Sequence, residues 1–243
     1  LTKEESGSYD PNHPFAGRDP RMAMTIIYPG MDWNGTVVNT LDKTINGKDN
    51  ANYPPSANNA SKTALTWRKY LDEQYANGIW NTNACPIVIR YAEVLLTYAE
   101  AVNELSGPSA DVYDKLDLIR GRVGMPKVDR EKYASKETLR RLIRRERGVE
   151  LAGEGVRRAD ILRWKDDNGK MVAETVLNGV LERVVGTVNY AETDPTKRAE
   201  IDTNAPATDK KIEDRVFKVH NRYNPIPQGA IDNNPNLEQN PGY

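Results

Sequence analysis

Two carboxylates one helical turn apart are the residues in this chain whose spacing best suits chemistry. Glu146 and Glu150 continue an apolar stripe that begins with Leu139, Leu142 and Ile143, so a helix would turn both toward its core face. A pair of carboxylates is enough to cleave a glycosidic bond, with no further motif. However, neighbouring arginines are expected to lower the pKa of both groups, which is the wrong direction for a general acid.

A structural role for the two carboxylates is the alternative, and it is the interpretation we adopt. A buried carboxylate is strongly destabilising unless a charged group hydrogen-bonds to it. The stretch from Lys136 to Lys165 is typical of a helix, a glycine turn at Gly153 to Gly155 and a second short helix. We expect arginines to clamp this stretch by pairing with the carboxylates, and the candidates are Arg90, Arg157, Arg158 and Arg163.

Aromatic side chains in the polar first third of the chain are candidates for a carbohydrate site. Trp33, Tyr53, Trp67 and Trp80 lie in sequence rich in Asn, Gly and Pro, and Asn34 adjoins the first of them. Aromatic rings stack on the C–H faces of sugars, while neighbouring amides and carboxylates reach the hydroxyl groups. The alternative, that each ring only anchors a long loop to the core, stays open.

Charge and motif content exclude several other classes of protein. The formal net charge is −1, which argues against a nucleic-acid binder, and the single Cys85 rules out an intrachain disulfide framework. The sequence contains no HExxH motif, P-loop, GxGxxG motif or GxSxG motif, so no metal or cofactor is expected. No apolar run approaches the roughly 20 residues of a membrane-spanning helix.

The elements that must position these side chains differ between the two parts of the chain. Residues 1 to 85 are predicted to be loop-rich, with a strand at Met22 to Tyr28 and a short hairpin that turns at Asn34-Gly35. Residues 86 to 243 are predicted to be helical with an extended, proline-punctuated tail. Asp194 to Asp214 is predicted as a long surface loop. We expect both parts to form one structural domain.

A pair of helices begins the second part. The first helix is predicted at about Ile87 to Leu105, and Ser109 is predicted to cap a second helix that ends near Gly124. The apolar stripe of the first helix comprises Val88, Tyr91, Ala92, Leu95, Tyr98, Ala99, Val102 and Leu105. Such a pair has the size of one tetratricopeptide-type unit, and units of this type need further helices to bury their faces.

Several motifs together resemble the SusD/RagB family. They fall in the family's order from about residue 17 to residue 243: Gly17 to Arg21, Arg90 to Asn103, Leu118 to Pro126, Glu146 to Trp164, and the tail PIP…NP…QNPGY. Gly148, Gly153 and Val156 depart from the pattern, since bulkier or aromatic residues are expected there. This departure predicts looser packing around the glycine turn.

The resemblance implies both a fold and a function. Members of the family are mainly α-helical, with tetratricopeptide-like helix pairs, irregular loops and a few short β-strands. They are lipid-anchored proteins of the outer membrane that bind glycans or other nutrients, without being enzymes, and deliver them to a SusC-like TonB-dependent transporter. This chain would be the C-terminal half of such a protein, and the lipid anchor would lie in sequence upstream of Leu1. No ligand-binding residue can be transferred by motif.

Two hypotheses follow. In the first, the protein captures a glycan at a site that Trp33, Asn34, Tyr53, Trp67 and Trp80 partly supply. In the second, it is a helical-repeat adaptor whose partner is another protein, here the transporter, and it does not bind a glycan directly.

Overall fold

The computed structural model describes residues 7–54, 59–75 and 84–243, and its contacts group the chain into two compact units. The first unit comprises Leu1–Arg157 with Arg183–Lys210, and the second comprises Arg158–Glu182 with Lys211–Tyr243. Trp80 lies outside the described residues. The predicted division at residue 85 stays a prediction.

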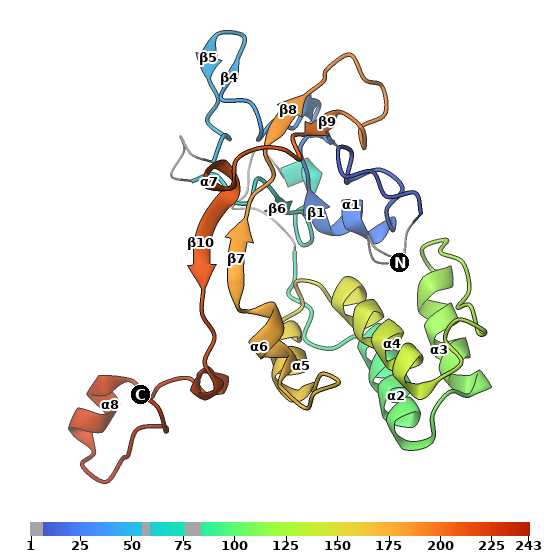
Figure 1. The fold of residues 1–243 in the computed structure, drawn as a ribbon, viewed down its shortest axis with the longest axis vertical. Helices are drawn as coiled ribbons and strands as arrows, with labels where there is room; N and C mark the ends of the chain where they lie inside the picture. Colours follow the sequence, from blue (N-terminus) through green and yellow to red (C-terminus); the bar gives the residue numbers. More distant parts are fainter. Residues whose placement is uncertain (1–6, 55–58, 76–83) are drawn as a thin grey trace. The chain divides into compact units, whose positions relative to one another are not determined.

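Three helices form the α-helical part of the first unit (Figure 1): α2 (Tyr91–Ser106), α3 (Ala110–Gly121) and α4 (Lys136–Glu150). Both α3 and α4 pack against α2. Ser109 caps α3 as predicted, because its side chain accepts a hydrogen bond from the Val112 N–H. The helices enclose one apolar core, which includes Leu96, Leu116, Leu139 and Ile143.

The buried face of α2 differs from the predicted stripe. Leu95, Leu96 and Ala99 are buried, and Asn103 is buried with them. Four members of the predicted stripe are exposed instead: Val88, Tyr91, Tyr98 and Leu105. The physical reason is geometric: α3 and α4 pack on one side of α2, and the apolar residues of its other side face outward.

A short helix replaces most of the strand predicted at Met22 to Tyr28. Helix α1 (Arg21–Thr25) is followed by β1 (Ile26–Ile27), which pairs with β6 (Thr66–Trp67). Asp19 causes the helical turn, since its carboxylate accepts a hydrogen bond from the Arg21 N–H and its carbonyl accepts one from Met22. An apolar run alone does not reveal these hydrogen bonds.

Two hairpins follow in the loop-rich part. The first pairs β2 (Asp32–Trp33) with β3 (Thr36–Val37), as predicted, and the second pairs β4 (Thr44–Ile45) with β5 (Lys48–Asp49). Asn34 and Gly35 both have positive φ, of 48° and 74°, which a two-residue hairpin turn requires. One turn of 3₁₀ helix, η1 (Glu73–Tyr75), lies further along this part.

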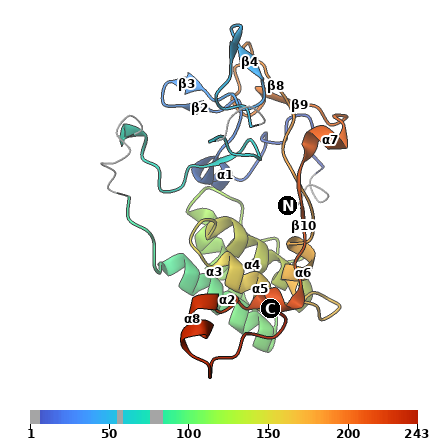
Figure 2. The same cartoon turned by 90° about the vertical axis from the view of Figure 1, so that its left-hand side faces the viewer.

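A second apolar core lies in the loop-rich part, and Trp33 and Val37 of the first hairpin pack against it. It includes Phe15, Ile27, Leu41, Val188 and Ala199. The last two belong to β8 (Gly186–Val188) and β9 (Ala199–Ile201), a strand pair that Figure 2 shows beside β4. The predicted surface loop at Asp194 to Asp214 is therefore wrong in part, because it also contains α7 (Ala207–Lys210) and β10 (Lys211–Arg215).

The second unit has a smaller core of its own. Ile161, Met171 and Ala173 are buried there. They belong to or adjoin α5 (Arg157–Arg163) and α6 (Val172–Val176), while β10 pairs with β7 (Gly179–Glu182). The tail predicted as extended, Tyr223 to Tyr243, contains one short helix, α8 (Gln228–Asn233), which begins after Pro227, and η3 (Val219–Arg222) precedes the tail.

Candidate functional site

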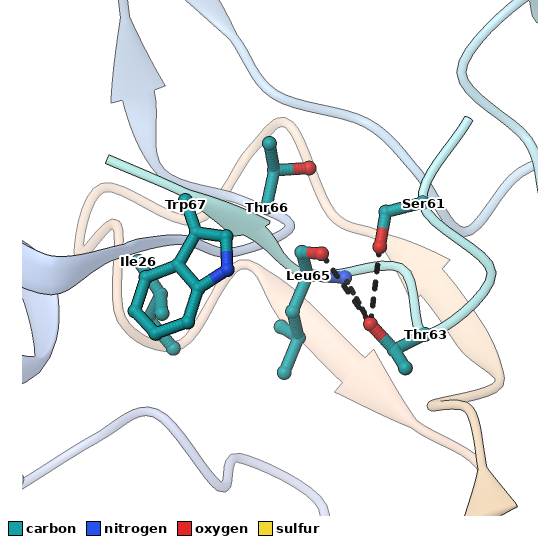
Figure 3. Close-up of a pocket in the computed structure, with 6 residues that line it drawn as sticks. All are labelled: Ile26, Ser61, Thr63, Leu65, Thr66 and Trp67. Atoms are coloured by element: carbon teal, nitrogen blue, oxygen red, sulfur yellow. Dashed lines mark hydrogen bonds between the residues drawn. The ribbon is translucent and has the colours of Figure 1, made fainter. Parts of the chain in front are cut away.

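A pocket of about 360 Å³ in the first unit is the candidate site. Figure 3 shows its lining residues: Ile26, Ser61, Thr63, Leu65, Thr66 and Trp67. Trp67 presents the largest surface, since 55% of its area is exposed. Three hydroxyl-bearing side chains and three apolar ones therefore share a small, open hollow.

Strand pairing holds Trp67 in place at this pocket. Trp67 lies opposite Ile26 in the β1–β6 ladder. Beyond the strand, the N–H groups of Arg68 and Lys69 both donate to the carbonyl oxygen of Thr25, at 2.9 and 3.2 Å. The backbone of this segment is thus fixed, which suits an exposed ring that must keep one orientation.

The hydroxyl groups of the pocket are organised by a local turn. The Thr63 Oγ1 lies 3.1 Å from the Ser61 Oγ, and it donates to the Leu65 carbonyl oxygen at 3.3 Å. The Thr63 Oγ1 also accepts a hydrogen bond from the Leu65 N–H at 3.4 Å. These contacts fix two hydroxyls near the indole, where a ligand could exchange hydrogen bonds with them.

The other predicted ligand-binding residues do not line this pocket. Trp33 is half-buried against the second core, and the Arg68 guanidinium lies 5.1 Å from its ring centre. Asn34 forms the hairpin turn. The Arg183 guanidinium lies 5.6 Å from the ring centre of Tyr53. The role of all these residues as ligand contacts stays a prediction.

Sequence reasoning missed five of the lining residues, namely Ile26, Ser61, Thr63, Leu65 and Thr66. Ile26 reaches the pocket only through the pairing of β1 with β6, which joins segments 40 residues apart. The closely spaced Ser61 and Thr63 were a usable signal, because such residues favour turns in which hydroxyls bond the backbone.

A buried network of ion pairs lies elsewhere in the first unit, around the carboxylates of α4. Glu146 is 3% exposed and accepts from Arg21 Nη2 at 2.9 Å and from Arg120 Nη1. Glu150 is 4% exposed and accepts from Arg21 Nη1 at 3.0 Å and Arg90 Nη1 at 2.7 Å. The prediction that both carboxylates are buried is confirmed.

Only part of the predicted set of partners is found at these carboxylates. Arg90 is present, but the remaining partners are Arg21, Arg120 and Arg122, which come from outside the Lys136 to Lys165 stretch. Arg163 donates to Asp160 at 2.7 Å, and Arg158 donates to the Asn221 carbonyl oxygen. The contribution of Arg157, Arg158 and Arg163 to the clamp stays a prediction.

A third carboxylate, Glu154, joins the network at the end of α4. It accepts from Arg90 Nε at 2.7 Å and from Lys69 Nζ. Lys69 Nζ also donates to the carbonyl oxygens of Glu150 and Ala152, at 3.2 and 3.0 Å. Lys69 thereby supplies both charge and hydrogen bonds to the carboxyl end of a helix, where cations are stabilising.

The protonation of Glu150 and Glu154 follows from their partners. Burial alone would raise the pKa of Glu150, but hydrogen bonds from Arg90 and Arg21 outweigh it and hold the pKa below its ordinary value. Burial would also raise the pKa of Glu154, but hydrogen bonds from Arg90 and Lys69 outweigh burial and lower this pKa as well. A lowered pKa does not suit a general acid, so this geometry is structural.

Two further findings concern metal binding and membrane-spanning helices. Among the described residues, no group of three or more His, Cys, Asp or Glu side chains is arranged to hold a metal ion. No helix in the part of the chain that the structure describes has the length and apolar character needed to cross a membrane.

Comparison with known proteins gives one family. The family model described as "SusD family" matches residues 1–243. A SusD-like protein, P25, from Formosa agariphila is 34% identical over 154 residues, which is 59% of this chain and 29% of that protein.

Solved structures from Bacteroides fragilis share the fold. A SusD-like carbohydrate-binding protein is 30% identical, with a TM-score of 0.71 over 96% of this chain and 44% of that one. A second SusD-like protein is 25% identical, with a TM-score of 0.67 over 95% of this chain and 40% of that one. The chain therefore spans less than half the length of these relatives, and its mainly α fold with short strands is theirs.

Proposed function

Because this chain belongs to the SusD family, we propose that it is part of a non-enzymatic glycan-binding protein. The observation that carries the proposal is Trp67, whose exposed ring borders a pocket with hydroxyl groups. A solved relative that is 30% identical is described as carbohydrate-binding, which supports the same ligand class.

The pocket suits a neutral sugar. The indole of Trp67, with Ile26 and Leu65, offers an apolar surface to the C–H face of a pyranose ring. Ser61, Thr63 and Thr66 offer hydroxyl groups that both donate and accept. None of these six described lining residues is ionisable, so the pocket has no charge of its own to hold a uronate or a sulfate group.

Delivery to a transporter is the finer part of the proposal. By its family, the full protein would be held at the outer-membrane surface by a lipid anchor and would pass its glycan to a SusC-like TonB-dependent transporter. The family resemblance supports this step. Co-purification of the full-length protein with an outer-membrane channel, and loss of glycan uptake on deletion of its gene, would test it.

Native affinity gels with the full-length protein test the glycan site. Gels cast with amylopectin, xylan, galactomannan or laminarin identify a polysaccharide that retards the wild-type protein. Trp67→Ala should abolish most of that retardation, because it removes the aromatic face on which the sugar ring would stack. Trp67→Phe should keep part of it, since a smaller aromatic ring remains.

Leu71→Ala is the matched control, because Leu71 is 52% exposed four residues away and does not line the pocket. It should migrate as the wild type does. Retardation of Trp67→Ala equal to that of the wild type would place the glycan site elsewhere in the full protein. No retardation in any gel would count against glycan binding itself.

A helical-repeat adaptor is the second candidate, and the outer side of α2 is the observation that favours it. Ile89, Val94, Tyr98 and Ala101 border an open hollow of about 390 Å³ on that helix. Exposed apolar surface of this kind suits contact with another protein, and by the family the partner is the transporter. Val94→Glu should then reduce co-purification with the channel and leave polysaccharide gels unchanged.

A further inference from the structure

The turn between α4 and α5 lies directly against the ring of Trp67. A Cβ atom built at Gly153 would lie 3.4 Å from Trp67 Cζ3 and 3.7 Å from Cε3. It would also lie 3.8 Å from the Cδ atom of Lys69. The looser packing predicted at Gly153 is thus corrected, because an aromatic ring from a distant strand occupies the space; at Gly148 the Arg157 guanidinium does the same, 3.5 Å from a built Cβ.

This turn is rigid enough to act as a support. Leu151 is buried with 1% exposure, at the point where α4 ends. Lys69 donates hydrogen bonds to the carbonyl oxygens of Glu150 and Ala152 and to the carboxylate of Glu154. One side chain therefore holds residues on both sides of Gly153. The segment that carries Trp67 is therefore tied to the turn only two residues beyond the ring.

We propose that Gly153 is a positioning residue of the glycan site: it lets the benzo ring of Trp67 lie on the turn, and this contact sets the orientation of the indole. The inference rests on the proposed function, since it concerns the same ring. Trp67 then contacts two different parts of the molecule. One is the pocket, which Ile26, Leu65 and the hydroxyl-bearing residues also line. The other is the turn at Gly153, a residue that does not line the pocket.

The requirement for glycine at this position has two parts. Gly153 has φ of +78°, a conformation that side chains with a Cβ atom rarely adopt. Gly155 has φ of +81°, but a Cβ atom there would meet nothing within 4 Å. Both glycines therefore need positive φ, but only Gly153 lies against the indole ring of Trp67. This makes Gly155 a matched control.

The experiment compares Gly153→Asn with Gly155→Asn in the full-length protein, because asparagine tolerates positive φ better than other residues with a side chain. The probe is whichever of amylopectin, xylan, galactomannan or laminarin retards the wild type. Gly153→Asn should weaken the apparent affinity at least tenfold, since its amide needs the space of the ring. Gly155→Asn should stay within about twofold of the wild type.

A spectroscopic readout separates positioning from stability. The fluorescence contribution of Trp67 is the difference between each protein and its Trp67→Phe derivative, and it needs no ligand. Its emission maximum should shift in Gly153→Asn and stay unchanged in Gly155→Asn. If Gly153→Asn does not fold, the pair Gly153→Asp and Gly155→Asp gives the same comparison with a side chain of the same length that also tolerates positive φ, and only the first should shift the emission.

The outcomes distinguish this inference from the proposed function. Unchanged emission and equal affinities for the two asparagine variants, or for the two aspartate variants, would overturn the positioning role while Trp67→Ala still abolished binding. A shifted emission in Gly153→Asn with binding insensitive to Trp67→Ala would refute the glycan site at Trp67, and with it the functional meaning of the support.

Discussion

Glu150 is the residue on which the buried network depends most. It is 4% exposed and accepts hydrogen bonds from three arginines, Arg21, Arg90 and Arg122. Removing its charge takes one carboxylate partner from each of these guanidinium groups, and Arg21 is itself only 4% exposed. We expect Glu150→Gln to lower the free energy of unfolding by about 3 kcal/mol, measured by urea denaturation.

Glu131→Gln is the control for that measurement, because Glu131 is exposed in the loop before α4. This change should stay within about 0.5 kcal/mol of the wild type. Equal stability of the two variants would show that the arginines around Glu150 are solvated rather than buried.

The same residues predict how stability responds to acid. The pKa values of Glu150 and Glu154 are held below the ordinary 4.5 in the folded protein. The unfolded chain therefore takes up these protons first, so their contribution is fully present above about pH 4.5 and is lost as pH falls through the folded values. The thermal midpoint should decline steeply below that pH, and less steeply in Glu150→Gln; parallel curves would contradict this.

At the scale of elements, α4 owes its start to a reciprocal cap. The Ser135 side chain accepts from the Thr138 N–H at 3.2 Å, and the Thr138 hydroxyl accepts from the Ser135 N–H at 3.2 Å. Ser135→Ala should lower the free energy of unfolding by about 1 kcal/mol, because one helical N–H loses its partner. Ser135→Asp should keep most of the lost stability, because a carboxylate also accepts from the Thr138 N–H. Thermal denaturation of both variants measures this. If Ser135→Ala lowers stability no more than Ser135→Asp does, the cap does not stabilise α4.

The helices could be predicted from the sequence because their causes are local. The stripe of α4, the cap at Ser109 and the glycine turn at Gly153 each depend on residues a few positions apart in the sequence, and the structure has them where the pattern indicates. The two-residue turn at Asn34-Gly35 is equally local. These parts confirm the mainly α family fold.

The strands and the network could not be predicted, because their causes are distant in sequence. β1 pairs with β6 and β10 pairs with β7, across gaps of roughly 30 to 40 residues. Arg21 was expected in or near a strand, and the structure instead places it in a helical turn against α4. Of the candidate site, only Trp67 was identified among the described residues, since its neighbours reach the pocket through pairing.

At the scale of the whole molecule, the described residues contain cores of unequal size. The helical core of the first unit includes thirteen buried side chains, whereas the core of the second unit has three, Ile161, Met171 and Ala173. A smaller core stabilises its surroundings less. We expect amides of the second unit to exchange with deuterium through openings of lower free energy than those of α2 to α4, measured by mass spectrometry under native conditions.

Met171→Ala tests this comparison further, because it removes a buried side chain from the smaller core and so widens the gap in opening free energy between the two units. Exchange should accelerate in residues 158–182 and 211–243 and stay constant in α2 to α4. A single opening free energy shared by all peptides, before and after the substitution, would show that the two units unfold as one.

The reach of Arg21 across the chain has a consequence for the order of folding. Its two carboxylate partners lie 125 and 129 residues further along the sequence. Loops of that length close late, whereas neighbouring helices such as α2, α3 and α4 associate early. The carboxylates of α4 are then hydrated until the Arg21 segment arrives, so the last long-range closure expels this water and joins the strand-rich part, with the pocket at Trp67, to a helical scaffold that has already formed.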